Sequence, residues 1–173
     1  MHTRFAAAGI AALIAPAALG ALGAPADATS GAQSWVMNGP TVHGTDHTVR
    51  IAAAGPIRGA GVLTQEFEET AGGDVVHAVW HLPRGTVTAD AAEDFGVDFD
   101  PTSCRGTATA SGTWVITGGT GAYAGASGHG TFTGAGTIIG ARDDRGRCLG
   151  PESGVDPKVA IVTLGGSGVA ELP

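Results

Sequence analysis

After residue 28 the hydrophobic pattern shows little helical periodicity and frequent strand signals, although residues 47–54 alternate only weakly. A period of two is typical of strands that bury one face. Turn-forming residues interrupt this pattern at short intervals, as at 72–74 and 143–146. Residues 89–94 could form one turn of helix, which Gly96 and Pro101 would end. The pattern predicts seven or eight strands, at residues 47–54, 57–68, 75–82, 85–90, 106–117, 126–141 and 158–164, with the tail to Leu172 closing the chain.

Glycine is abundant, at 30 of 173 residues, and much of it falls inside the predicted strands. Glycine within a strand permits bulges, sharp bends and close approach of another backbone. These features favour a closed barrel over a sandwich, because a small barrel needs strong coiling at its corners. The sequence therefore predicts an all-β fold, a small antiparallel barrel. The glycines in question are Gly59, Gly61, Gly112, Gly128, Gly130, Gly134 and Gly136.

The first 28 residues have the order of a secretory signal: a short positive start, an apolar stretch at 5–23, and small residues at Ala26-Asp27-Ala28. A membrane anchor is the alternative, but Pro16 interrupts the stretch and no second apolar span follows. We expect a signal peptide at 1–28, a single barrel domain at 29–173 without a membrane span, and a secreted, extracellular protein.

The only two cysteines are Cys104 and Cys148. An oxidising compartment favours a disulfide between them, with two free buried thiols as the alternative. The histidines are scattered and no metal-binding motif is present, so no metal site is expected.

Charge narrows the choice of partners. The chain carries 9 Lys and Arg against 16 Asp and Glu, a net charge of −7, so no basic surface for nucleic acid is expected. The acidic run from Asp90 to Asp100 is interpreted as a solvated loop rather than a calcium site. A relaxed dinucleotide fingerprint at residues 119–124 lacks the helix that would complete it, so no cofactor is expected.

Residues 113–132, TWVITGGTGAYAGASGHGTF, carry the most specific motif, and residues 59–91 extend the match. This stretch resembles the allene oxide cyclase family, which is related to the dirigent proteins. The resemblance implies a calycin-like barrel of eight antiparallel strands that binds a hydrophobic small molecule, and a dimer or trimer. It also implies isomerase or cyclase chemistry, although the candidate first strand, 47–54, lacks the family's carboxylate, so no catalytic residue is transferred.

Some individual side chains could carry chemistry. Glu66 is a candidate acid or base, His77 a candidate proton shuttle and Tyr123 a candidate carbonyl-polarising group. Each has a simpler interpretation, as a solvated strand end, an exposed histidine or a turn anchor. Trp80 and Trp114 are candidate ligand-binding residues or core residues. Three hypotheses remain open: binding with cyclisation or isomerisation, non-enzymatic binding of a lipid or other ligand, and a filled structural barrel of the cell envelope.

Overall fold

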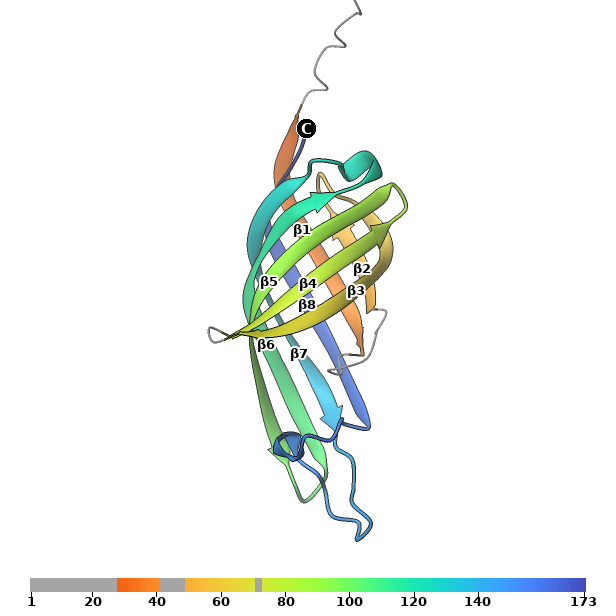
Figure 1. The fold of residues 1–173 in the computed structure, drawn as a ribbon, viewed down its shortest axis with the longest axis vertical. Helices are drawn as coiled ribbons and strands as arrows, with labels where there is room; N and C mark the ends of the chain where they lie inside the picture. The colour runs from red at the N-terminus through yellow and green to blue at the C-terminus, as the bar shows by residue number, and fades with distance from the viewer. Residues whose placement is uncertain (1–27, 41–48, 71–72) are drawn as a thin grey trace, which may run out of the picture.

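The computed structural model describes residues 28–40, 49–70 and 73–173. Consecutive strands pair antiparallel, and β1 pairs with β8, which closes a barrel of eight strands (Figure 1). The all-β antiparallel barrel is therefore confirmed. The strands are β1 (Thr29–Pro40), β2 (Val49–Ala54), β3 (Gly59–Thr70), β4 (Gly73–Leu82), β5 (Gly85–Asp100), β6 (Arg105–Gly119), β7 (Ser127–Ile139) and β8 (Val159–Leu172), with single turns of 3₁₀-helix at η1 (Gly121–Tyr123) and η2 (Pro151–Ser153).

Two parts of the sequence prediction are wrong. β1 was not predicted, yet it pairs with both β2 and β8. The acidic loop and the helical turn at 89–94 are instead the second half of β5, which pairs with β6 as far as Asp100↔Arg105. The physical reason is a period-two pattern that continues past residue 90, with Phe95, Val97 and Phe99 on one face and aspartates on the other. The predicted signal peptide lies outside the described residues, except for Ala28.

The interior combines aliphatic side chains with large aromatic ones that pack against glycine. Trp35, Trp80 and Trp114 are each at most 9% exposed. A Cβ atom at Gly166 would overlap the indole of Trp35, and one at Gly130 would overlap that of Trp114. Glycine on these inward positions therefore leaves the volume that the indoles fill.

One end of the barrel is fastened by a buried amide. Gln33, on β1, is 2% exposed, and its amide accepts from the backbone N–H of Ile57 and donates to its carbonyl, both at 3.0 Å. Both polar ends of this buried side chain have partners, so its hydrogen bonds offset the cost of burying it while it ties β1 to the β2–β3 connection.

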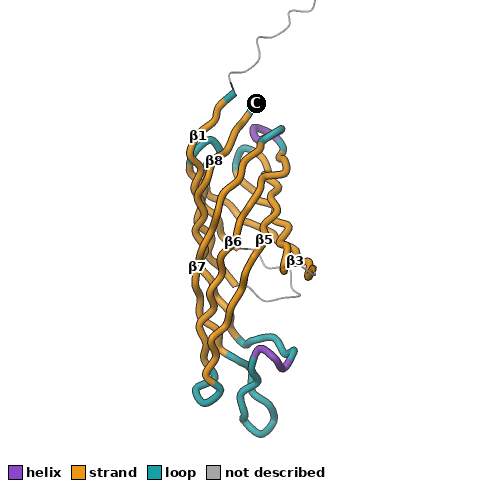
Figure 2. The backbone as a smooth tube through the Cα atoms, turned by 90° about the vertical axis from the view of Figure 1, so that its left-hand side faces the viewer, coloured by secondary structure: helices purple, strands orange, loops and turns teal. Residues whose placement is uncertain are grey.

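The strands differ in length, and the barrel is open along one side at its other end. β4 pairs with β5 only as far as Asp74↔Glu93, so within the described residues 94–100 pair with β6 alone. The long strands β5 to β8 run on past this point, where the 140–158 connection and η2 lie (Figure 2). We call this the lower end. No helix in the described part of the chain is both long enough and apolar enough to cross a membrane.

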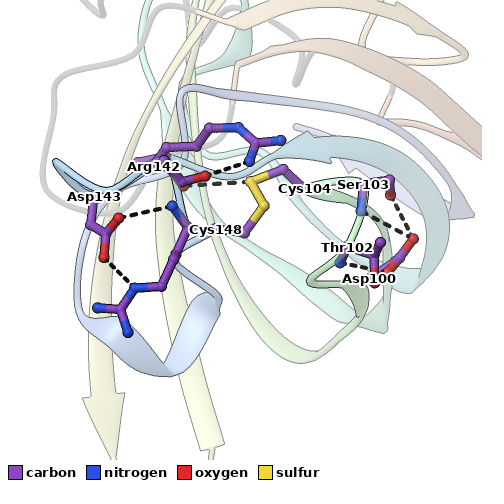
Figure 3. The surroundings of a disulfide bond; sticks show 10 residues. Asp100, Thr102, Ser103, Cys104, Arg142, Asp143 and Cys148 are labelled. Carbon is purple, nitrogen blue, oxygen red and sulfur yellow. Dashed lines mark hydrogen bonds and ion pairs between the residues drawn. A yellow bond between two sulfur atoms is a disulfide. The ribbon is translucent and has the colours of Figure 1, made fainter.

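The predicted disulfide is present at the lower end. Cys104 and Cys148 are bonded, with their Cα atoms 5.3 Å apart. The bond ties the β5–β6 turn to the 140–158 connection (Figure 3). It therefore holds that connection in place relative to the strands.

Candidate functional site

A pocket of about 370 Å³ lies at the lower end, between the inward side of the long strands and the 140–158 connection. β5 supplies Phe95, Val97 and Phe99, because alternate residues of a strand face the same side. β7 and β8 supply Ile138 and Ala160. The connection supplies the remaining wall, which consists of Leu149, Gly150, Pro151, Gly154, Val155, Asp156 and Pro157, with Gly140 at its base.

Local hydrogen bonds and the disulfide fix the connection that forms this wall. Leu149, next to Cys148, donates its backbone N–H to the carbonyl of Ala141 at 2.9 Å. The Asp143 carboxylate accepts from the backbone N–H of Arg147 at 2.8 Å and from its guanidinium at 2.7 Å (Figure 3). These hydrogen bonds hold the pKa of the Asp143 carboxyl below its usual value, and the bond from the Arg147 backbone N–H contributes most. The pocket wall is thus built on a cross-linked and internally bonded turn.

The turn on the other side of the disulfide is capped by Asp100. Its carboxylate accepts from the Ser103 hydroxyl at 2.7 Å and from the backbone N–H of Thr102 at 2.8 Å (Figure 3). The hydrogen bond from the Ser103 hydroxyl is the main reason that the pKa of Asp100 is lowered. Asp100, which the sequence pattern assigned to a solvated loop, therefore caps the β5–β6 turn.

A second, smaller cavity of about 50 Å³ lies in the closed part of the barrel. The ring centroids of Trp35 and Trp80 are 6.0 Å apart, and Trp114 and Phe132 complete an aromatic lining. At this size the cavity holds little more than a water molecule or two. Trp80 and Trp114, the candidate ligand-binding residues, both line this small cavity. Their role in ligand binding stays a prediction.

The three catalytic candidates do not converge in either space. Glu66 is exposed on the outer side of β3. His77 lies on the outer side of β4, with Nδ1 2.8 Å from Asp90 and Nε2 3.2 Å from Glu68. Tyr123 is fully buried in η1.

His77 and Tyr123 both have hydrogen-bond partners on neighbouring elements. The hydrogen bond to Asp90, followed by that to Glu68, raises the pKa of His77. The Tyr123 hydroxyl donates to the carbonyl of Arg58 at 2.8 Å, which anchors the turn after β6. No group of three or more His, Cys, Asp or Glu side chains among the described residues is placed to hold a metal ion.

The sequence did not single out the polar groups that do face inward. Gln65 and Glu93 line the small cavity, and Glu93 is followed on the same face of β5 by Phe95, which lines the lower pocket. The signal that could have found Glu93 was the alternation of β5. Continued from residue 85 to residue 100, it places Glu93 on the face of the apolar residues rather than among the solvated aspartates.

Comparison of the chain with protein-family models, with curated proteins and with solved structures finds no match. The resemblance to allene oxide cyclases therefore stays a prediction.

Proposed function

We propose that this chain is a secreted barrel, resembling the allene oxide cyclases, that binds a hydrophobic small molecule in its lower pocket. The observation that carries the proposal is the pocket itself, whose volume of about 370 Å³ falls in the range of roughly 300–1,000 Å³ typical of ligand sites. Phe95 is 41% exposed and Val155 48% exposed, so the lining presents apolar surface that a ligand would cover. Covering such surface is the main source of affinity for an apolar ligand.

The charge of the lining narrows the class of ligand. Among the described residues that line the lower pocket, none is basic, and Asp156 is the only acid. Glu93 precedes Phe95 by two residues on the same face of β5, which places it about 7 Å further along the strand. A neutral apolar molecule fits this lining, because the carboxylate of a fatty acid would meet Asp156 and no cation within it. The cations Arg105, Arg142 and Lys158 line a neighbouring pocket of about 570 Å³ that shares Gly140 with this one.

The lining also favours binding over acid–base catalysis. Glu66, His77 and Tyr123 all lie outside both spaces, so no set of titratable groups converges on a bound molecule. The site is therefore best described as one for carriage of a ligand.

The proposal is tested with a neutral fluorescent probe, N-phenylnaphthylamine, whose emission rises in apolar surroundings. We expect saturable binding to the full chain. Binding should weaken at least tenfold in Phe95→Asp, because a carboxylate would replace an apolar wall of the pocket. Val62→Asp is the matched control, since Val62 is 38% exposed on the outer side of β3. Equal binding by both variants would show that the probe does not occupy the lower pocket.

Isomerase or cyclase activity is the second candidate, and one observation favours it. Glu93 lines the aromatic cavity, where a carboxyl group could exchange a proton with a substrate. This candidate requires the ligand to extend from the lower pocket toward Glu93. Native mass spectrometry of protein purified from culture medium would identify a co-purifying ligand. If Glu93→Gln left the conversion of that ligand unchanged, Glu93 would have no catalytic role.

A further inference from the structure

The pocket next to the lower pocket lies on the other face of the sheet. Its volume is about 570 Å³. Successive residues of a strand point to opposite faces, and on β7 Ile138 lines the lower pocket whereas Ile139 lines this second one. Among the described residues, Gly140, which directly follows β7, is the only one that the two linings share. The two pockets therefore open on different faces of the same strands.

Three cations line this second pocket, and none of the described residues that line it is acidic. Arg105 begins β6, Arg142 lies in the 140–158 connection, and Lys158 directly precedes β8. We call this space the cationic pocket. The chain carries 16 Asp and Glu against 9 Lys and Arg, so its charges by number alone would place more acids than bases in any one pocket. Three like charges that line one pocket repel one another, and a bound anion relieves that repulsion.

The disulfide and the strand pairing bring the three cations together. Cys104, just before Arg105, is bonded to Cys148, whose backbone pairs with that of Arg142 beside the disulfide (Figure 3). β7 pairs with both β6 and β8, which places Lys158, at the start of β8, across β7 from the start of β6. The cations are therefore carried by a cross-linked and paired backbone.

For each of these cations, the acid nearest in the sequence is engaged elsewhere. Asp100 stands opposite Arg105 in the register, but its carboxylate accepts hydrogen bonds within its own turn. The carboxylate of Asp143 binds the guanidinium of Arg147, and Asp156 lines the lower pocket. Within the described part of the chain, no ion pair includes any of the three pocket cations. Their charges are therefore available to a ligand.

We propose that the cationic pocket binds the phosphate group of a phosphate monoester. Such a group carries roughly 1.5–2 negative charges at neutral pH and three strong acceptor oxygens. It can therefore accept from two guanidinium groups and one ammonium group at once, and the planar guanidinium fork matches two phosphate oxygens. A carboxylate carries a single charge and would leave most of the positive charge unpaired. This site does not depend on the neutral-ligand site in the lower pocket, because the two pockets lie on different faces.

The proposal is tested by isothermal titration calorimetry of the full chain with glycerol 3-phosphate at a fixed ionic strength. We expect one site with a dissociation constant below about 1 mM. Glycerate, which carries one charge, should bind at least tenfold more weakly. Arg105→Gln should also weaken glycerol 3-phosphate at least tenfold, because it removes a charge-assisted hydrogen-bond donor. The matched control is Arg50→Gln, an exposed cation on the outer side of β2, which should leave binding unchanged.

The choice of variant avoids Arg142, because its guanidinium also donates to the carbonyl of Gly146 at 2.7 Å and so helps to hold the connection. If Arg105→Gln does not fold, Lys158→Gln tests the same pocket. Retained binding of N-phenylnaphthylamine by either variant would show that the fold and the lower pocket are intact, which separates failure of this proposal from failure of the proposed function.

The source of the phosphate is distinguished with phosphatidylcholine vesicles that contain phosphatidic acid. Sedimentation of the chain with these vesicles, lost in Arg105→Gln, would assign a lipid phosphate, whereas binding of glycerol 3-phosphate without sedimentation would assign a soluble one. Absence of saturable binding of glycerol 3-phosphate would overturn the proposal. Equal weakening by Arg50→Gln and Arg105→Gln would do so as well, and equally tight binding of glycerate would contradict the choice of phosphate.

Discussion

Removal of the disulfide should affect both the stability of the barrel and the shape of the lower pocket. The perturbation is the double substitution Cys104→Ala and Cys148→Ala. The bond closes a loop with a sequence separation of 44 residues. In the chain-entropy description, freeing a loop of this length stabilises the unfolded state by about 4 kcal/mol. For a domain of this size, that loss lowers the melting temperature by roughly 10 °C.

The double variant should also lose affinity for the neutral probe, because Leu149, which lines the pocket, follows Cys148 directly. Urea denaturation followed by tryptophan emission measures the stability, and probe titration measures the pocket. Wild-type protein reduced with dithiothreitol separates loss of the cross-link from loss of the cysteine side chains. A change below about 1 kcal/mol in both samples would refute the argument that the bond restrains the unfolded chain.

Two further predictions concern the barrel wall. Gly166→Ala should destabilise the fold by about 1–3 kcal/mol, because its Cβ would overlap the Trp35 indole. Gly165→Ala, whose Cβ would meet no atom closer than 3.9 Å, is the control for urea denaturation, and equal effects would contradict the packing argument. The raised pKa of His77 means that its pairing with Asp90 and Glu68 stabilises the fold below about pH 6.5 and is lost as the pH rises through the folded-state pKa. An NMR titration of the His77 ring should show this, and a folded-state pKa below the ordinary value would reverse the expected sign.

Much of the fold could be predicted from the sequence because the strand pattern is local. The seven strands from β2 to β8 fall on predicted segments, and alternation together with turn residues was sufficient to find them. β1 was missed because its residues, TSGAQSWVMNGP, mix small polar and apolar side chains without a turn signal before them. The second half of β5 was missed because its aspartates resemble a solvated loop, although the intervening apolar residues keep a period of two.

The candidate site could be predicted much less well, because a strand has two faces and the sequence of one strand does not say which is inside. On β4 the histidines and Trp80 lie on opposite faces, and either face was a reasonable interior. The structure places Trp80 inside, because it packs against Trp35 on β1, and so places His77 outside. That contact joins residues 45 positions apart and has no counterpart in the local pattern.

By itself, the sequence determined the β class, the glycine-rich strand interiors and the one cysteine pair that the chain can form. Only the tertiary structure decided that β5 extends beyond its pairing with β4 and that a cross-linked connection forms a pocket at that end. The physical reason is register. Local alternation sets which residues share a face, but the pairing of distant strands sets which faces meet, which edges stay unpaired and where a pocket remains.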